Sequence, residues 1–380
     1  FDALLLLVFS LIFYYVFSLL VKENFFGPNI WDSYTLQSLA WLEGRTDLGR
    51  NYEWLELAVF NGKYYLSFPP LPSVVNLPFA ALLGNNVPAN LIVAIYGSLS
   101  IVTGFKILRL CGVSRETAVF WALFLVWGSN MLWMTTVGGV WFQAQALNML
   151  LCLGAVFFAL KDKSVPCLAF CALAVGCRPF SAVYLVLLAI CFIKKHGFRS
   201  QLRSYIIPVI IAVVMMVYNY ARFGNVLEFG HNYLPEFTRS EKGQFSLSYL
   251  LPNLKNVLFR LPSWKNGEFH PVHDGFCLFL ANPLFVVLVV SQGQDLAGRK
   301  TDFTGIGLSV AMIMNLLFLC THKTMGGWQF GARYICDLLP FAFMYLAGRG
   351  HMQRPTPWEL AAGSFALLFN LFGALYMHLA

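Results

Sequence analysis

Long apolar segments separated by short polar connections recur along the whole chain. About eleven of them are suited to crossing, as helices, a hydrocarbon slab of roughly 30 Å. The pattern predicts an all-α, polytopic integral membrane protein with about 11 transmembrane helices in a single domain over residues 1–380. The predicted spans cover residues 3–22, 88–110, 115–134, 140–160, 164–177, 180–195, 203–221, 274–292, 303–321, 333–348 and 357–379.

The composition agrees with this class of protein. Hydrophobic residues make up 58% of the chain and charged residues 12%, and the mean hydropathy is +0.65. The charged fraction is about half that of an average soluble domain, which excludes a soluble fold. The first apolar segment has no basic region before it and no small-residue cleavage site, so we interpret it as a span rather than a signal peptide. The nine cysteines fall within or at the ends of apolar segments and are predicted to be small buried hydrophobes.

The basic residues are unevenly distributed between the connections, and this distribution fixes the topology. When the spans are threaded alternately, the short basic connections all fall on one side, which the positive-inside rule makes cytoplasmic. The exterior side then receives two long loops, residues 23–87 and 222–273, and the shorter 321–332. We therefore expect the functional residues on the exterior face. The basic connections contain Lys106, Arg109, Arg115, Lys161, Lys163, Lys194, Lys195, Arg199, Arg203, Arg299, Lys300, Arg349 and Arg354.

One apolar segment of the first exterior loop is not counted as a span. Residues 71–84 read LPSVVNLPFAALLG, which is short and, with Pro70, contains three prolines. Counting it as a span would also invert the charge pattern of every later loop. We predict that it forms a helix lying at the exterior membrane surface.

A carboxylate begins the stretch DSYTLQSLAWLEG in the same loop. Asp32 lies at the N-cap position of a predicted helix whose apolar and polar positions fit a helix resting on the bilayer. The local sequence supports a helix cap and a catalytic residue equally, and the two roles do not exclude each other.

This first loop resembles that of the GT-C superfamily, the polytopic glycosyltransferases that use polyprenyl- or dolichyl-phosphate sugars. The resemblance includes Asp32 after the first span, Tyr34 and Gly44 close behind it, and GKYYLSFPP at residues 62–70. Further similar stretches are YNYARFGNVLEFG at 218–230 and GGWQFGARY at 326–334. The protein O-mannosyltransferases and aminoarabinose transferases belong to this superfamily. The resemblance implies a GT-C-like fold with Asp32 as catalytic base, although Ser33 stands where many members have a second acid.

Several cations lie near the exterior ends of the predicted spans and are candidates for contact with a donor phosphate, whose charge needs fixed cations or hydrogen-bond donors. The alternative is snorkelling to the lipid headgroups, which we favour for Lys323. Donor contact is favoured for Arg333, within a Gly-rich stretch, and for Arg222, which Gly224 follows. Arg178 holds either phosphate or the carbonyls freed by Pro179. The donor-phosphate candidates are Arg222, Arg333, Lys63, His322 and Arg178.

Aromatic residues crowd the same face, and for most of them a membrane-interface belt is the simpler explanation. We select Tyr34, Tyr64, Trp141 and Trp328 as candidates for substrate binding. His270, His273 and Asp274 have side chains suited to a metal, but Pro271 disfavours a two-ligand helix face, so we predict an interfacial loop and no metal site. No cofactor is predicted, and a role for a divalent cation is left open.

We therefore predict a glycosyltransferase that moves a sugar from a polyprenyl-phosphate carrier to a glycan, lipid or protein acceptor. Asp32 would act as base in an inverting displacement on the exterior face of a cytoplasmic (inner) membrane. The expected partners are the lipid-linked donor, the acceptor and membrane lipids. Nucleic acid is not among them, because the net charge of +8 is explained by the cytoplasmic loops. A secondary transporter and a lipid-linked oligosaccharide polymerase or ligase are the alternatives.

Overall fold

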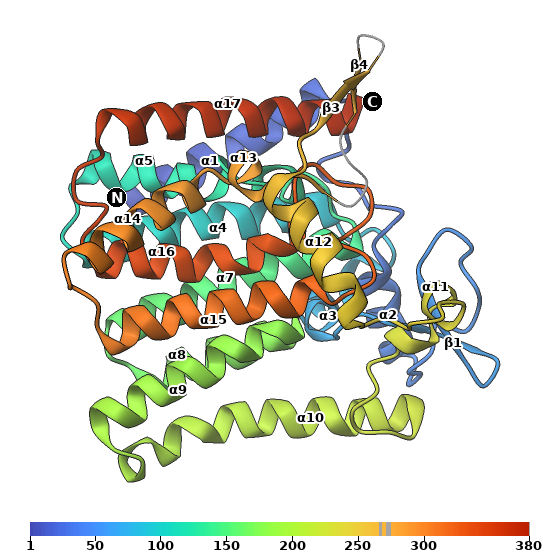
Figure 1. Cartoon of the computed structure of the whole chain (residues 1–380). Helices are drawn as coiled ribbons and strands as arrows, with labels where there is room; N and C mark the ends of the chain where they lie inside the picture. The colour runs from blue at the N-terminus through green and yellow to red at the C-terminus, as the bar shows by residue number, and fades with distance from the viewer. Residues whose placement is uncertain (266–267, 271–274, 380) are drawn as a thin grey trace.

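The structure is a computed structural model that describes residues 1–265, 268–270 and 275–379. It is a bundle of helices that run side by side in roughly the same or opposite direction (Figure 1). Sheet structure in the described residues is confined to two short hairpins. The main bundle helices are α1 (Asp2–Leu20), α4 (Ala89–Leu110), α5 (Arg115–Val126), α7 (Val140–Leu160), α8 (Ser164–Val175), α9 (Ala182–His196), α10 (Ile206–Phe223), α14 (Leu284–Ala297), α15 (Phe303–Cys320), α16 (Leu339–Gly348) and α17 (Pro357–Leu379).

Each of the predicted spans contains a helix, and the all-α membrane fold is confirmed. Seven helices of the described part are long and apolar enough to cross a membrane. The remaining predicted spans are shorter or divided, so the count of eleven crossings stays a prediction. The chain breaks between α5 and the short α6 (Met131–Met134) at Gly128, and between α13 (Leu278–Ala281) and α14 at Pro283. Proline removes a backbone donor and glycine weakens a helix, so both breaks have a local cause.

Helix α7 lies in the centre of the bundle and packs against α4 and α8. Its buried residues include the polar Gln143, Gln145 and Asn148 near its first turns. Helix α10 lies at the edge of the bundle, and Val213, Val214 and other apolar residues along it are exposed. An exposed apolar helix of this kind suits contact with lipid.

The first long loop folds into α2 (Ser33–Leu42), the hairpin of β1 (Leu57–Phe60) with β2 (Lys63–Leu66), and α3 (Leu71–Leu83). The predicted surface helix at 71–84 therefore exists as α3. The polar residues of α2 face inward, and the contact of this helix with the bilayer stays a prediction. Ser38 donates to the carbonyl of Ser73 at 2.8 Å, and the hydroxyl of Ser73 donates to Gln37 at 2.7 Å. These hydrogen bonds hold the polar face of α2 against α3, while Leu42 is exposed.

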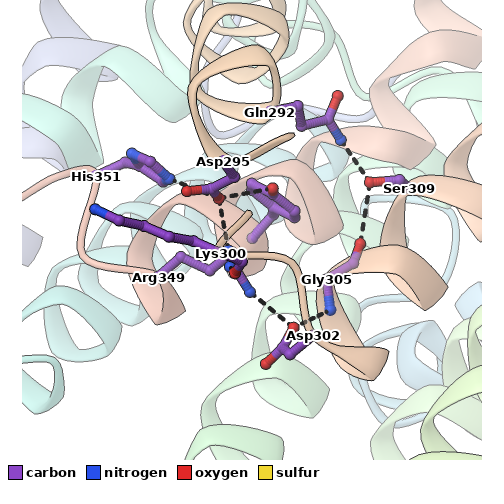
Figure 2. Close-up of polar contacts among 9 residues, drawn as sticks. Gln292, Asp295, Lys300, Asp302, Gly305, Ser309, Arg349 and His351 are labelled. Carbon is purple, nitrogen blue, oxygen red and sulfur yellow. Dashed lines mark hydrogen bonds and ion pairs between the residues drawn. The ribbon is translucent and has the colours of Figure 1, made fainter. Parts of the chain in front are cut away.

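The short basic connections lie together at one end of the bundle, and the two long loops lie at the other (Figure 1). This is the arrangement predicted from the charges. At the basic end, the carboxylate of Asp295 on α14 accepts hydrogen bonds from Tyr345, Arg349 and His351 at 2.7–2.9 Å (Figure 2). Arg349 also donates to Asp302, which caps α15, at 2.7 Å. This cluster joins the ends of α14, α15 and α16.

Candidate active site

A cavity of about 840 Å³ lies at the end of the bundle that carries the long loops. Its wall is formed by the chain before α2, the start of α7, residues 231–237, residues 322–334 and the end of α17. A second cavity of about 280 Å³ extends beside it toward Arg178 and Cys177. The two cavities share six lining residues, which are Phe68, Trp141, His231, His322, Arg333 and Tyr334.

Arg333 reaches this wall from a glycine-rich loop that buried amides hold in place. The side chain of Asn130 accepts from the backbone N–H of Ala332 at 2.9 Å, and Gln329 accepts from the N–H of Arg333 at 2.8 Å. Gly331 has φ +78°, and a Cβ there would lie 1.9 Å from the amide nitrogen of Asn130. Only glycine fits this approach.

The guanidinium of Arg333 is buried, with the residue 6% exposed. It lies over the rings of Tyr334, Trp141 and Phe142 at 5.2–5.9 Å. Its Nε has no hydrogen-bond partner, and no carboxylate within the described ranges forms an ion pair with it. Burying a guanidinium without a carboxylate partner costs free energy unless an anion pairs with it. Arg333 is therefore suited to bind an anionic ligand.

Arg178 lines the smaller cavity but has its own counter-ion. Its Nε and Nη2 each lie 3.0 Å from Oδ2 of Asp337, whose side chain is fully buried. Gln145 and Asn148 of α7 also donate to Asp337. The Arg178 guanidinium lies 4.5 Å over the ring of Tyr334. The proposed contact with carbonyls freed by Pro179 is thus replaced by an ion pair that fixes the guanidinium beside the cavity.

Two histidines complete the shared wall. Burial lowers the pKa of His322 to about 4, and burial likewise lowers the pKa of His231. Both rings are therefore neutral at pH 7. His231 donates from Nδ1 to the carbonyl of Ser67 at 2.8 Å, and His322 donates from Nδ1 to that of Thr324 at 2.6 Å. The wall can thus offer imidazole groups to a ligand without adding formal charge.

Trp141 lies between the cavities, and its Nε1 donates to Glu56 at 3.0 Å. Its ring is 5.9 Å from that of Trp31, while Trp328 lines the larger cavity and is 56% exposed. Glu56 was not predicted as a site residue, because nothing in the sequence near it distinguishes it from any other loop carboxylate.

Asp32 caps α2, as expected, and is 6% exposed. Its Oδ1 accepts from the N–H of Thr35 at 3.2 Å, and its Oδ2 accepts from the Thr35 hydroxyl at 2.6 Å. Burial raises its pKa to about 6, against the opposing effect of these hydrogen bonds. Asp32 does not line either cavity itself, although the preceding Trp31 does.

Tyr34 lies behind the cavity wall rather than on it. It is fully buried against Leu66, Val140 and Trp141, and its hydroxyl has no hydrogen-bond partner in the described structure. Burial raises its pKa, and the charges of Asp32 and Arg178 act on it with opposite sign. Tyr34 is therefore close to both Asp32 and Arg178.

Three predicted site residues are placed elsewhere. Arg222 donates to the carbonyl of Leu66 at 2.8 Å and to Asn219 at 2.9 Å, so it anchors the β1–β2 hairpin. Lys63 lies at the turn of that hairpin and pairs with Asp47 at 3.3 Å. Tyr64 packs in a small cluster beneath α2. None of the three lines the two cavities described above, so their contacts are structural.

The described residues contain no group of three or more histidine, cysteine, aspartate or glutamate side chains positioned to hold a metal. His270 lies at the end of β4 (Glu268–His270), and His273 and Asp274 lie outside the described residues.

The fold and site together define a multi-pass membrane protein with a cavity at the long-loop end of its helix bundle, lined by Arg333 and by three carboxylates. No family model matches the sequence, and no curated protein does. The fold is similar to solved structures. One is ArnT from Cupriavidus metallidurans bound to undecaprenyl phosphate, with TM-score 0.54 and 16% identity over 93% of this chain and 61% of that one. Another is apo ArnT, with TM-score 0.56 and 13% identity over 97% and 76%.

A third similar structure is the apo oligosaccharyltransferase of Archaeoglobus fulgidus, with TM-score 0.54 and 13% identity over 99% of this chain and 56% of that one. This chain thus spans only about three fifths of the ArnT chain with bound lipid and less of the oligosaccharyltransferase. These similarities confirm the multi-pass helical fold predicted from the sequence, which this chain shares with the two ArnT structures and the oligosaccharyltransferase.

Proposed function

We propose that this protein transfers a sugar from a polyprenyl-phosphate carrier to an acceptor hydroxyl at the exterior face of a cytoplasmic membrane. The observation that carries the proposal is the buried Arg333, which forms no ion pair with a carboxylate of the described chain and has no hydrogen-bond partner for its Nε, on a cavity shared with His231 and His322. A lipid phosphate would supply the missing anion. The similar fold of ArnT with bound undecaprenyl phosphate supports a ligand of this class.

The chemistry assigned to Asp32 is that of a general base. Its carboxylate would accept the proton of the acceptor hydroxyl while the hydroxyl oxygen attacks the anomeric carbon. The bond from that carbon to the phosphate oxygen breaks at the same time, and its electron pair leaves with the polyprenyl phosphate. Attack from the face opposite the leaving group inverts the anomeric configuration. The raised pKa of about 6 brings the carboxyl nearer to the pH at which a base works best.

Donor binding tests the proposal through Arg333. The protein in lipid nanodiscs is titrated with undecaprenyl phosphate and followed by tryptophan fluorescence, since Trp141 lines both cavities. Arg333→Ala is expected to weaken binding by on the order of 2 kcal/mol, about 30-fold. Arg222→Ala is the matched control, because it removes a buried arginine whose partners are protein groups and is expected to leave the affinity unchanged.

Equal affinity of the wild type and Arg333→Ala would remove the main support for the proposal. Transfer itself is tested with a panel of radiolabelled polyprenyl-phosphate sugars and membrane extracts as acceptor. Labelled product that depends on both Arg333 and Asp32 is the expected result.

A further inference from the structure

The larger cavity carries more negative than positive charge. Three carboxylates line it, and Arg333 is the one lysine or arginine among the described residues on its wall. The imidazoles of His231 and His322 are neutral at pH 7 because burial lowers their pKa values. The wall therefore keeps two unbalanced negative charges even before a ligand enters. The three carboxylates are Glu23, Glu56 and Glu236.

Two of these carboxylates lie where the cavity continues outward. Glu56 and Glu236 also line a groove of about 580 Å³, which Glu53 adjoins and which includes no lysine or arginine among its described lining. The charge of Glu56 helps burial to raise the pKa of Glu236, so the two side chains are close. The charge of Lys323 partly offsets that of the Glu236 carboxylate, and its Nζ donates to the backbone carbonyl of Glu236 at 2.7 Å. Within the described residues, Glu56 accepts a hydrogen bond from the Trp141 indole and forms no ion pair.

The third carboxylate lies on another part of the wall. Glu23 follows α1, is about half exposed, and lies 3.8 Å from the ring of His378 at the end of α17. The end of α17 and the short helix α11 (Pro235–Thr238), which contains Glu236, are well separated in Figure 1. The negative charge is therefore spread around the cavity rather than confined to one corner.

We propose that the acceptor held in this cavity is a neutral or amine-bearing hydroxyl compound, and that anionic acceptors are excluded. The inference rests on the proposed function, because a donor phosphate on Arg333 would cancel the one guanidinium charge that the described wall of the larger cavity supplies. A second anion would then face Glu23, Glu56 and Glu236 with no free cation of the described wall to pair with. An acceptor whose hydroxyl is flanked by ammonium groups could instead pair these groups with carboxylates on separate parts of the wall.

The test uses three octyl β-glycosides that differ in charge, namely the glucoside, the 2-amino-2-deoxyglucoside and the glucuronide. Each is titrated into nanodisc-bound protein saturated with undecaprenyl phosphate, and signal from empty nanodiscs is subtracted. The glucuronide is expected to bind at least about tenfold more weakly than the other two. The double variant Glu23→Gln, Glu56→Gln should reduce this difference in affinity between the glucuronide and the other two glycosides at least about threefold. Glu241→Gln, an exposed carboxylate outside the cavities, should leave it unchanged.

Equal binding of the three glycosides, or a gap unaltered by the double variant, would overturn this inference while leaving the donor site intact. Failure of undecaprenyl phosphate itself to bind would count against the proposed function instead. Gln retains an oxygen that accepts from the Trp141 indole, and unchanged thermal unfolding of the double variant confirms that only charge has been altered.

Discussion

Asp32→Asn should make the folded protein more stable while making it a poorer enzyme. Burial raises the pKa of Asp32 from 3.8 to about 6, so the folded state holds this proton more tightly than the unfolded chain does. This difference between the folded and unfolded pKa values corresponds to about 3 kcal/mol in the free energy of unfolding. The contribution of the Asp32 carboxyl to the free energy of unfolding is fully present below about pH 4 and is lost as the pH rises through about 6. Asn caps helices as well as Asp does and carries no charge to desolvate.

A favourable interaction of the carboxylate with the N-terminus of α2, worth about 0.5–1 kcal/mol, is lost in the variant. The net gain expected above pH 7 is therefore about 2 kcal/mol, and it should vanish near pH 4. Intrinsic fluorescence of the ten tryptophans during heating reports unfolding across this pH range. Asp47→Asn is the control, since that carboxylate pairs with Arg45 and Lys63 and should show no gain.

Transfer by Asp32→Asn should be at least about a hundredfold slower than by the wild type. A stable variant with wild-type turnover would reduce Asp32 to a helix cap and refute its role as base. A variant no more stable than the wild type at pH 7.5 would show that the carboxylate is not desolvated as its burial indicates.

Other substitutions test single contacts. Asp337→Asn leaves Arg178 without its buried counter-ion and should destabilise the protein by about 3–5 kcal/mol in a chemical or thermal unfolding assay. Gly331→Ala forces a Cβ against Asn130 and should weaken undecaprenyl phosphate binding by displacing Arg333, whereas Gly243→Ala, at a positive-φ turn with open space around it, should not. Arg349→Ala opens the cluster that joins α14, α15 and α16, so it should lower the unfolding temperature without altering donor affinity.

The sequence was sufficient to predict the bundle because hydrophobic periodicity and loop charge are local and strong signals. The assignment of 71–84 as a surface helix depended on the same charge pattern; α3 confirms the helix, and its position at the membrane surface stays a prediction. The β1–β2 hairpin was missed, although Asn61–Gly62 between two apolar runs is a strong hairpin signal. Asn61 and Gly62 have φ angles of +49° and +73°, as a tight primed turn requires. The inward polar face of α2 had no such signal, because its partners Ser73 and Asn76 lie on α3.

The site was predicted less completely, because Arg222 and Arg333 look alike in sequence. Both follow aromatic or small residues near the end of a span, and both are buried in the structure. They differ in partners that lie far away along the chain. The carbonyl of Leu66 and the side chain of Asn219 accept from Arg222, although its Nε has no partner, whereas the Arg333 guanidinium contacts aromatic rings and has no hydrogen-bond partner among the described residues. Asp337 was within reach of sequence reasoning, since an acid inside an apolar span indicates a specific role.

The buried polar residues of the bundle concentrate at the end that carries the cavity, and this explains how an apolar fold can hold a charged site. Asn130 and Asn282 form paired hydrogen bonds at 2.9 and 3.0 Å that join α6 to α13. Asn130 in turn fixes the loop of Arg333, while Asp337 fixes Arg178. Burying each amide or carboxylate here costs free energy, and the hydrogen bonds offset this cost only when the whole network forms. The guanidinium groups are therefore positioned before any ligand arrives, so binding a phosphate needs little further ordering of the protein.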